Sequence, residues 1–196
     1  MKNVLITLGV IGLLLFFVFQ WAVGINNQII EKEGLTLAQW ANVESSYQRR
    51  ADLVPNLVAT VKAYAAHEKE TLEGVIKARS EATKTTIDPT NITEEQMAKF
   101  QQAQQGLSGA LSRLLVTVER YPDLKANQNF LELQSQLEGT ENRINVERNR
   151  YNELTGAYNI YIAKFPTNFI ANFINKKSLP LFKSAAGSEV APTVEF

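Results

Sequence analysis

The fold of this 196-residue chain is decided by the stretch WANVESSYQRRADLVPNLV, residues 40–58. Apolar side chains recur in it every three or four residues, the spacing that places them on one face of an α-helix. The stripe continues at the same spacing beyond this stretch, and its members are Trp40, Val43, Tyr47, Arg50, Val54, Leu57, Val61, Ala65, Glu68, Leu72 and Val75. We predict one long helix over residues 36–82, begun by a capping box at Thr36 and Gln39.

Two further helices follow, and no segment alternates with period two for long enough to predict a strand. The second helix is predicted over residues 93–121 and the third from Phe130 to Phe165, each stopped by a proline. Polar loops at residues 83–92 and 122–127 connect them. Because the second loop is short, we expect the second and third helices to be antiparallel neighbours.

The N-terminal segment is long and apolar enough to cross a membrane. Between Val4 and Ile25 the only strongly polar residue is Gln20, and such a helix spans about 33 Å against a hydrocarbon core of about 30 Å. We predict a retained single-pass anchor that contacts the lipid bilayer from Val4 to Ile25. The alternative is a cleaved secretory signal ending near Ala22-Val23-Gly24. Lys2 favours a cytoplasmic N-terminus, which places the rest of the chain on the non-cytoplasmic, periplasmic side.

Together these elements predict an all-α protein. An N-terminal transmembrane helix is followed by an antiparallel bundle of three long helices, a short amphipathic C-terminal helix at TNFIANFI, and a tail. The predicted boundaries are a transmembrane anchor at residues 1–25, a juxtamembrane linker at 26–35, the helical bundle at 36–170 and a C-terminal tail at 171–196.

The composition argues against several classes of function. Twenty Lys and Arg balance 20 Asp and Glu, and no basic cluster stands beside an aromatic platform, so we expect no nucleic acid partner. There is no cysteine, and His67 is the single histidine. His67-Glu68 begins like a zinc motif, but Thr71 stands where the second histidine is needed. We therefore predict no metal, no cofactor and no catalytic residue, that is, a protein that is not an enzyme.

Several polar residues fall on or beside the apolar stripes, where an unpaired charge would cost several kcal/mol. We predict that they form a structural polar layer, whose members are Arg49, Arg50, Asp52, Asn56, His67, Glu119 and Glu141. Aligning the second helix against the first places Glu119 beside Arg49 or Arg50, and Glu141 beside His67. Pro55 lacks an amide donor, so we predict a helix kink near Asp52.

The membrane end of the first helix is predicted to be an interaction surface. This helix measures about 70 Å and the second about 44 Å, so part of its stripe extends beyond any partner within the chain. Three large side chains are left there: Trp40, Val43 and Tyr47. We predict a homo-oligomer packed through residues 36–54. The alternative is that the tail covers this stripe with Phe182 and Phe196.

Two long stretches resemble the LemA family of bacterial membrane-anchored helical proteins. They are YQRRADLVPNLVATVKAYAAHEKETLEGVIKAR, residues 47–79, and ERYPDLKANQNFLELQSQLEGTENRINVERNRYN, residues 119–152. The likeness extends through AYN, residues 157–159, to APTVEF, residues 191–196. It departs at ANFINKKSLPLF, residues 171–182, where family members carry a Phe-Gly-Phe element. The resemblance implies an anchored antiparallel bundle in the bacterial inner membrane, with no catalytic activity established for the family.

Two classes of function stay open. A membrane-tethered scaffold or adaptor of the cell envelope is favoured, because an anchor and long helical stripes are present whereas a catalytic constellation is absent. Its expected partners are the bilayer, further copies of the chain, and a membrane protease or another envelope protein. The alternative is an envelope hydrolase, or an accessory subunit of a membrane protease, with a polar site around Arg50, Glu119 and His67.

Overall fold

The computed structural model describes residues 2–183 and contains no strand in that part of the chain. Its helices are α1 (Lys2–Tyr64), α2 (Lys69–Lys84), α3 (Glu94–Val118), α4 (Pro122–Lys125), α5 (Gln128–Ala163) and α6 (Thr167–Phe173), with a 3-10 turn, η1, at Pro89–Asn91. The predicted all-α fold is confirmed.

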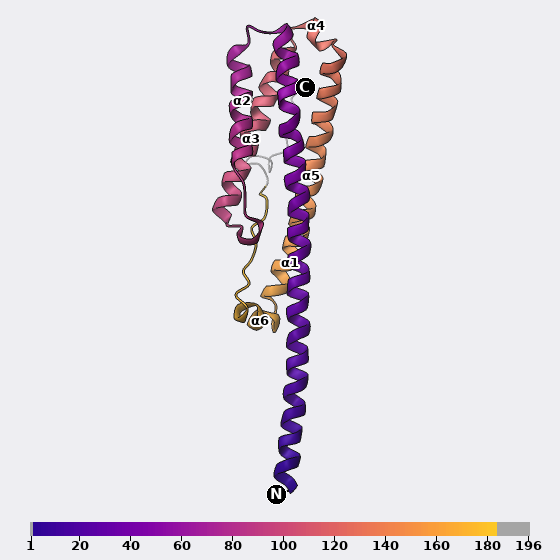
Figure 1. The fold of residues 1–196 in the computed structure, drawn as a ribbon, viewed down its shortest axis with the longest axis vertical. Helices are drawn as coiled ribbons and strands as arrows, with labels where there is room; N and C mark the ends of the chain where they lie inside the picture. The colour runs from indigo at the N-terminus through magenta and orange to yellow at the C-terminus, as the bar shows by residue number, and fades with distance from the viewer. Residues whose placement is uncertain (1, 184–196) are drawn as a thin grey trace, which may run out of the picture.

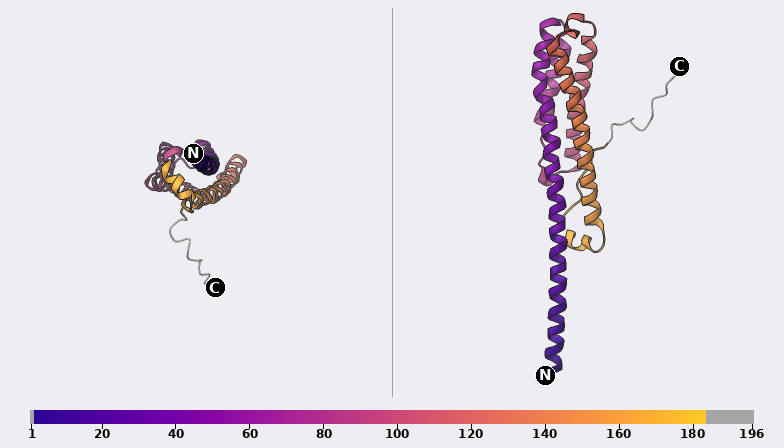
Figure 2. Two further views of the ribbon diagram at one scale, coloured as in Figure 1. Left: turned by 90° about the horizontal axis from the view of Figure 1, so that it is seen from below. Right: turned by 90° about the vertical axis from the view of Figure 1, so that its right-hand side faces the viewer.

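The helices α1, α2, α3 and α5 lie side by side, and α1 extends far beyond the others (Figures 1 and 2). From the N-terminus α1 ascends, α2 descends, α3 ascends and α5 descends, with α1 packed mainly against α5 and α2 packed mainly against α3. The predicted single helix over residues 36–82 is wrong, because the chain turns back at residues 65–68. A four-residue turn is close to one helical turn, so the apolar spacing keeps its phase across the break.

The first helix begins much earlier than predicted. α1 is continuous from Lys2, so the predicted linker at residues 26–35 is helical. Thr36 lies inside the helix, and its hydroxyl donates to the Lys32 carbonyl at 3.0 Å rather than capping an end. α1 also continues on both sides of Pro55. α3 begins instead with a reciprocal capping box, formed by Thr93 and Gln96.

Three apolar clusters follow one another along α1. The distal core, near the α1–α2 turn, includes Val54, Leu57, Val61, Leu72, Val75, Leu107, Leu114, Leu124 and Phe130. The middle core consists of Trp40, Val43, Tyr47, Ile87, Ile92, Met97, Phe100, Ile144, Tyr151 and Phe182. The basal cluster consists of Ile25, Ile29, Tyr158, Ile162 and Ala171. These clusters cover α1 from Ile25 upward and leave its first part bare.

The bare part of α1 is the strongly apolar one. Its most apolar 18-residue window has a mean hydropathy of 2.4, and none of that window is buried in the protein. Phe16, Phe17 and Phe19 are each about 60% exposed, at 58%, 61% and 64%. α1 therefore has the length and composition needed to cross a membrane.

The predicted self-association surface is wrong. Trp40, Val43 and Tyr47 are buried within the chain, with exposed fractions of 1%, 0% and 6%. Because α2 folds back along α1, α3 begins low enough for Phe100 to pack on Trp40, with ring centroids 5.4 Å apart. The Phe182 ring stacks on Trp40 with ring centroids 5.7 Å apart. At Phe182 the tail therefore covers the stripe, as the alternative prediction stated. The other predicted contact, Phe196, lies outside the described residues.

Candidate functional site

A buried cation joins the distal and middle cores. The side chain of Arg50 is 2% exposed. Its Nη1 donates to Glu141 Oε2 at 2.8 Å and to Ser108 Oγ at 2.7 Å. Its Nη2 donates to the carbonyl and side-chain oxygens of Gln104, at 3.1 and 2.7 Å. This arginine node ties α1 to α3 and α5, and the 46% exposure of Glu141 shows that the ion pair meets solvent on one side.

The structure brings together only two of the seven predicted polar-layer residues, Arg50 and Glu141. Glu119 pairs instead with Lys125 beside α4, and both side chains are mostly exposed. The predicted pairing of Arg49 or Arg50 with Glu119 is wrong, because α2 descends beside α1 before α3 returns. The end of α3 therefore lies opposite the α1–α2 turn, where Arg120 donates to Glu68 at 3.0 Å.

The remaining members of the predicted layer lie at the surface. Arg49, Asp52 and Asn56 are exposed on α1, and His67 is exposed in the turn between α1 and α2. The predicted proximity of Glu141 and His67 is wrong for the same topological reason. Among the described residues no group of three or more His, Cys, Asp or Glu side chains could hold a metal.

The same topology overturns the alternative polar site. Arg50 lies at the arginine node, Glu119 beside α4 and His67 in the α1–α2 turn. These three side chains form no common site, so the hydrolase site predicted around them is wrong.

An extended segment of the tail fills the space between α3 and α5. We call residues 177–183 the strap, and the surface of α5 beneath it the strap groove. Asn152 accepts the Phe182 N–H at 2.8 Å and donates to the Phe182 carbonyl at 2.9 Å. Asn159 does the same for Leu179, at 2.8 Å in both directions. The backbone of the strap thus obtains from side chains the partners that a strand obtains from a sheet.

The two asparagines match the strap in length. Seven residues of helix rise about 10.5 Å, and three extended residues span about 10 Å. Asn152 and Asn159 are seven apart, and the residues they hold, Phe182 and Leu179, are three apart. Each amide therefore reaches the backbone of one strap residue without strain in either element.

A tyrosine precedes each asparagine and extends the same pattern. Tyr151 donates to the Pro180 carbonyl at 3.2 Å and Tyr158 to the Lys177 carbonyl at 3.3 Å. Burial raises the pKa of both phenols, and that of Tyr158, which also faces Glu33, reaches about 12. Sequence reasoning missed this groove, although the dipeptide Tyr-Asn recurs seven residues apart within YNELTGAYN, residues 151–159.

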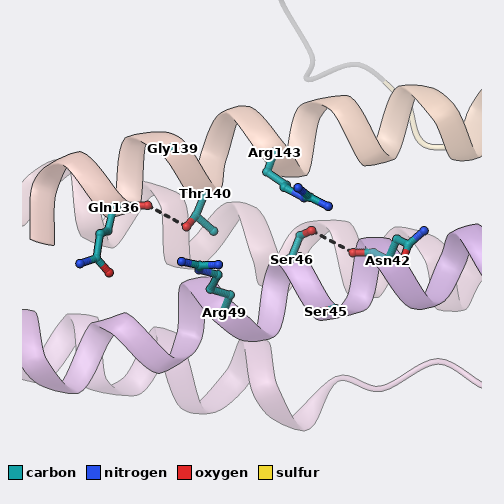
Figure 3. A pocket seen from close by; sticks show the side chains of 8 residues that line it. All are labelled: Asn42, Ser45, Ser46, Arg49, Gln136, Gly139, Thr140 and Arg143. Atoms are coloured by element: carbon teal, nitrogen blue, oxygen red, sulfur yellow. Dashed lines mark hydrogen bonds between the residues drawn. The ribbon is translucent and has the colours of Figure 1, made fainter.

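A second groove runs along the opposite side of α5, where this helix packs on α1. We call it the outer groove, and Figure 3 shows Arg49 reaching into it from α1 and Arg143 from α5. Its volume is about 450 Å³. The lining residues are Asn42, Ser45, Ser46, Arg49, Gln136, Gly139, Thr140 and Arg143. The hollow exists because serine, glycine and threonine stand where larger side chains would fill it.

The outer groove is polar and cationic. Two of its eight lining residues are arginines and none is acidic. Arg49 makes no hydrogen bond or ion pair with any described residue, whereas Arg143 lies 3.2 Å from Glu147 and is still 71% exposed. A second hollow of about 410 Å³ shares Gln136 and continues the groove toward Thr60. The arrangement offers hydrogen-bond partners and positive charge to a segment laid along it.

Fold and site together define a class of protein. A four-helix bundle continues from a long apolar helix. Its buried Arg50 holds three helices together, and its outer groove is open to solvent and polar. The chain is a membrane-associated helical protein.

It belongs to the LemA family, whose model matches residues 39–196. It is similar to protein LemA of Metamycoplasma hominis, with 23% identity over 181 residues, which cover 92% of this chain and 76% of that protein. It is also similar to the magnetosome proteins MamQ 1 and MamQ 2 of Paramagnetospirillum magneticum, with 28% identity over 165 residues. That match covers 76% of this chain and 61% of each MamQ protein, so the chain spans about three fifths of their length.

Proposed function

We propose that the protein is a membrane-tethered scaffold of the bacterial cell envelope that docks a partner protein in its outer groove. In this proposal residues 4–25 remain in the mature chain as the anchor, and the bundle stands in the periplasm. The partner is another envelope protein, which binds through an acidic segment. No chemical step is assigned to the bundle.

The observation that carries this proposal is the pair of arginines facing the outer groove. Neither core needs these two charges for its packing, because the Arg50–Glu141 ion pair and the hydrogen bonds from Gln39 to Glu147 already tie α1 to α5. Arg49 and Arg143 are both exposed and approach the groove from opposite helices (Figure 3). Carboxylates of a docked segment can accept paired hydrogen bonds from such guanidinium groups.

The length of the outer groove fits a helix or an extended segment. Its two hollows run from Asn42 to Thr60 along α1, about 27 Å at 1.5 Å per residue. The first hollow carries two arginines and the second carries Glu132. Charged groups of this kind govern specificity and the rate of association more than affinity, and the arginine end favours an acidic segment. We therefore expect binding that weakens at high salt.

The test is site-specific photo-crosslinking in native membranes. The chain has no cysteine, so Ser45→Cys carries a single photoreactive label in the outer groove. Ser112→Cys is the matched control, because Ser112 is an exposed serine on α3, outside the residues that line the groove. We expect a discrete adduct with an envelope protein from position 45 and none from position 112.

Charge reversal then tests the chemistry of the contact. Arg49→Glu combined with Arg143→Glu should lower the adduct yield on the order of tenfold, while circular dichroism shows an unchanged helix content. Equal labelling at positions 45 and 112, or an adduct of twice the chain's own mass, would contradict the proposed docking. A mature N-terminus near Ile25, measured by intact mass, would contradict the anchor.

A further inference from the structure

The lower end of the folded body carries a row of exposed phenylalanines. Phe165, Phe169 and Phe173 are 79%, 65% and 91% exposed. Phe169 and Phe173 lie four residues apart and therefore on one side of α6, and Phe165 lies in the turn before this helix. The rings of Phe165 and Phe169 pack edge to face with centroids 5.8 Å apart. We call this row the phenylalanine ridge, and large apolar side chains gathered in this way mark a contact surface.

The ridge lies level with the end of the apolar part of α1. The basal cluster joins Ala171 of α6 to Ile25 and Ile29 of α1. In Figure 1, α6 lies beside α1 at the lower end of the folded body, next to the point where α1 becomes bare. The apolar run of α1 ends at Ile25, and the polar sequence Asn26-Asn27-Gln28 follows. A bilayer crossed by α1 therefore has its surface at the height of α6.

The residues around the ridge have the character of a membrane interface. Lys164 and Lys177 are exposed on either side of α6 in the sequence. Trp21, on the last apolar turns of α1, is 50% exposed. Helices that lie in the headgroup region combine aromatic side chains directed to the acyl chains with lysines near the phosphates. Continuity with the apolar helix favours lipid as the occupant over a protein.

We infer that the phenylalanine ridge inserts into the membrane leaflet nearest the bundle, as a second lipid contact beside the anchor. The inference rests on the proposed anchoring through α1 and is independent of the outer groove. A single helix leaves the bundle free to rotate about its axis, whereas a second contact fixes that rotation. The ridge thereby sets the direction in which the outer groove faces along the membrane surface.

Depth-dependent fluorescence quenching tests the inference on the full chain. Three single-cysteine variants carry the same environment-sensitive label: Phe169→Cys on the ridge, Leu14→Cys in the anchor and Val116→Cys on α3. Val116 is a matched control because it is apolar and 71% exposed, far from the bare part of α1. The vesicles contain phosphatidylethanolamine and phosphatidylglycerol with nitroxide lipids at shallow or deep positions. We expect the label at 169 to be quenched most by the shallow nitroxide, that at 14 by the deep one, and that at 116 by neither.

The outcomes separate the ridge from the anchor. Quenching at 14 without quenching at 169 overturns the ridge and leaves the anchor in place, whereas no quenching at either position overturns both. Blue-shifted emission at 169 without lipid quenching shows a protein covering the ridge and also overturns the inference. Phe165→Ser with Phe173→Ser, at unchanged helix content, should lower the shallow quenching at 169 at least twofold.

Discussion

The distal and middle cores belong to the same bundle, yet different interactions close them. In the distal core, aliphatic side chains from α1, α2, α3 and α5 pack directly on one another. In the middle core, aromatic rings dominate, and Phe182 of the strap fills the space that helices leave between them. An extended segment can replace a helical surface only if its backbone groups find partners, and the two Tyr-Asn pairs of α5 supply them.

Substitution of Arg50 is expected to have the largest effect on stability, because the arginine node joins the two cores. Arg50→Ala removes a buried charge and leaves Gln104 and Ser108 without their donor. We expect the free energy of unfolding to fall by about 2 to 5 kcal/mol, because a buried acceptor left unpaired costs about 1 to 3 kcal/mol and the packing of the arginine stem is lost as well. Chemical unfolding of the full chain in mild detergent, followed by circular dichroism, measures this loss.

A double-mutant cycle identifies the partner of Arg50. The effects of Arg50→Ala and Glu141→Ala should be non-additive, because the two side chains form an ion pair at 2.8 Å. Glu119→Ala is the matched control and should be additive with Arg50→Ala. Coupling to Glu119 in place of Glu141 would contradict the observed topology. In it, α2 folds back between α1 and α3, so the end of α3 that precedes Glu119 lies far from Arg50.

A cavity in the distal core should weaken the bundle without loosening the strap. Leu114 is fully buried there, so Leu114→Ala should lower the free energy of unfolding by about 2 to 5 kcal/mol. Under conditions where the variant remains folded, trypsin cleavage after Lys177 should keep its wild-type rate. Faster cleavage after Lys177 at full helix content would show that packing in the distal core also holds the strap, and would contradict the separation of the two cores.

Periodicity predicted much of this fold, and its failures have physical causes. It placed α3 and α5 within a few residues of their observed ends, because both are bounded by a capping residue or a proline. Periodicity missed the turn at residues 65–68, because the apolar residues before and after the turn keep the same helical spacing. The burial of Arg50 could be predicted from its place on the stripe, but its partner depended on that missed turn.

The strap groove lay beyond sequence reasoning for another reason. The Tyr-Asn repeat is visible in the sequence, yet an asparagine on a helix has no assigned partner until the chain that crosses it is known. Leu179 and Phe182 lie in an irregular segment without periodicity, and their positions follow from the match between helical rise and extended length. The outer groove was equally hidden, since it arises from small side chains on two helices that meet only in the fold.

Removing both asparagines should release the strap while the distal core stays folded. Each amide makes two hydrogen bonds to the strap backbone, and a net contribution of about 1 kcal/mol per bond gives about 2 kcal/mol for each. We expect trypsin cleavage after Lys177 to accelerate on the order of tenfold or more in Asn152→Ala with Asn159→Ala. Asn149→Ala is the matched control, because Asn149 is exposed on the same helix. Unchanged cleavage in the double variant would mean that the Phe182 ring and the hydrogen bonds from Tyr151 and Tyr158 hold the strap without the asparagines.

The smallest effect we predict is a loss of strap stability at high pH through Tyr158. Burial, with Glu33 nearby, raises the pKa of this phenol from 10.0 to about 12 in the folded chain. A group whose pKa is raised by folding contributes stability that is fully present below its unfolded pKa and is lost as the pH rises through its folded pKa. The contribution of Tyr158 is therefore complete below pH 10 and declines between pH 10 and about 12. A fluorophore on the strap at Ser178→Cys follows release in this range, and ultraviolet absorbance follows ionisation of the phenol. Tyr158→Phe lacks the titrating group and the bond to Lys177, so it should bind the strap less tightly at neutral pH and show a smaller change above pH 10. An alkaline transition of equal size in both proteins would assign the effect to the other buried phenols, Tyr47 and Tyr151, whose pKa values burial also raises.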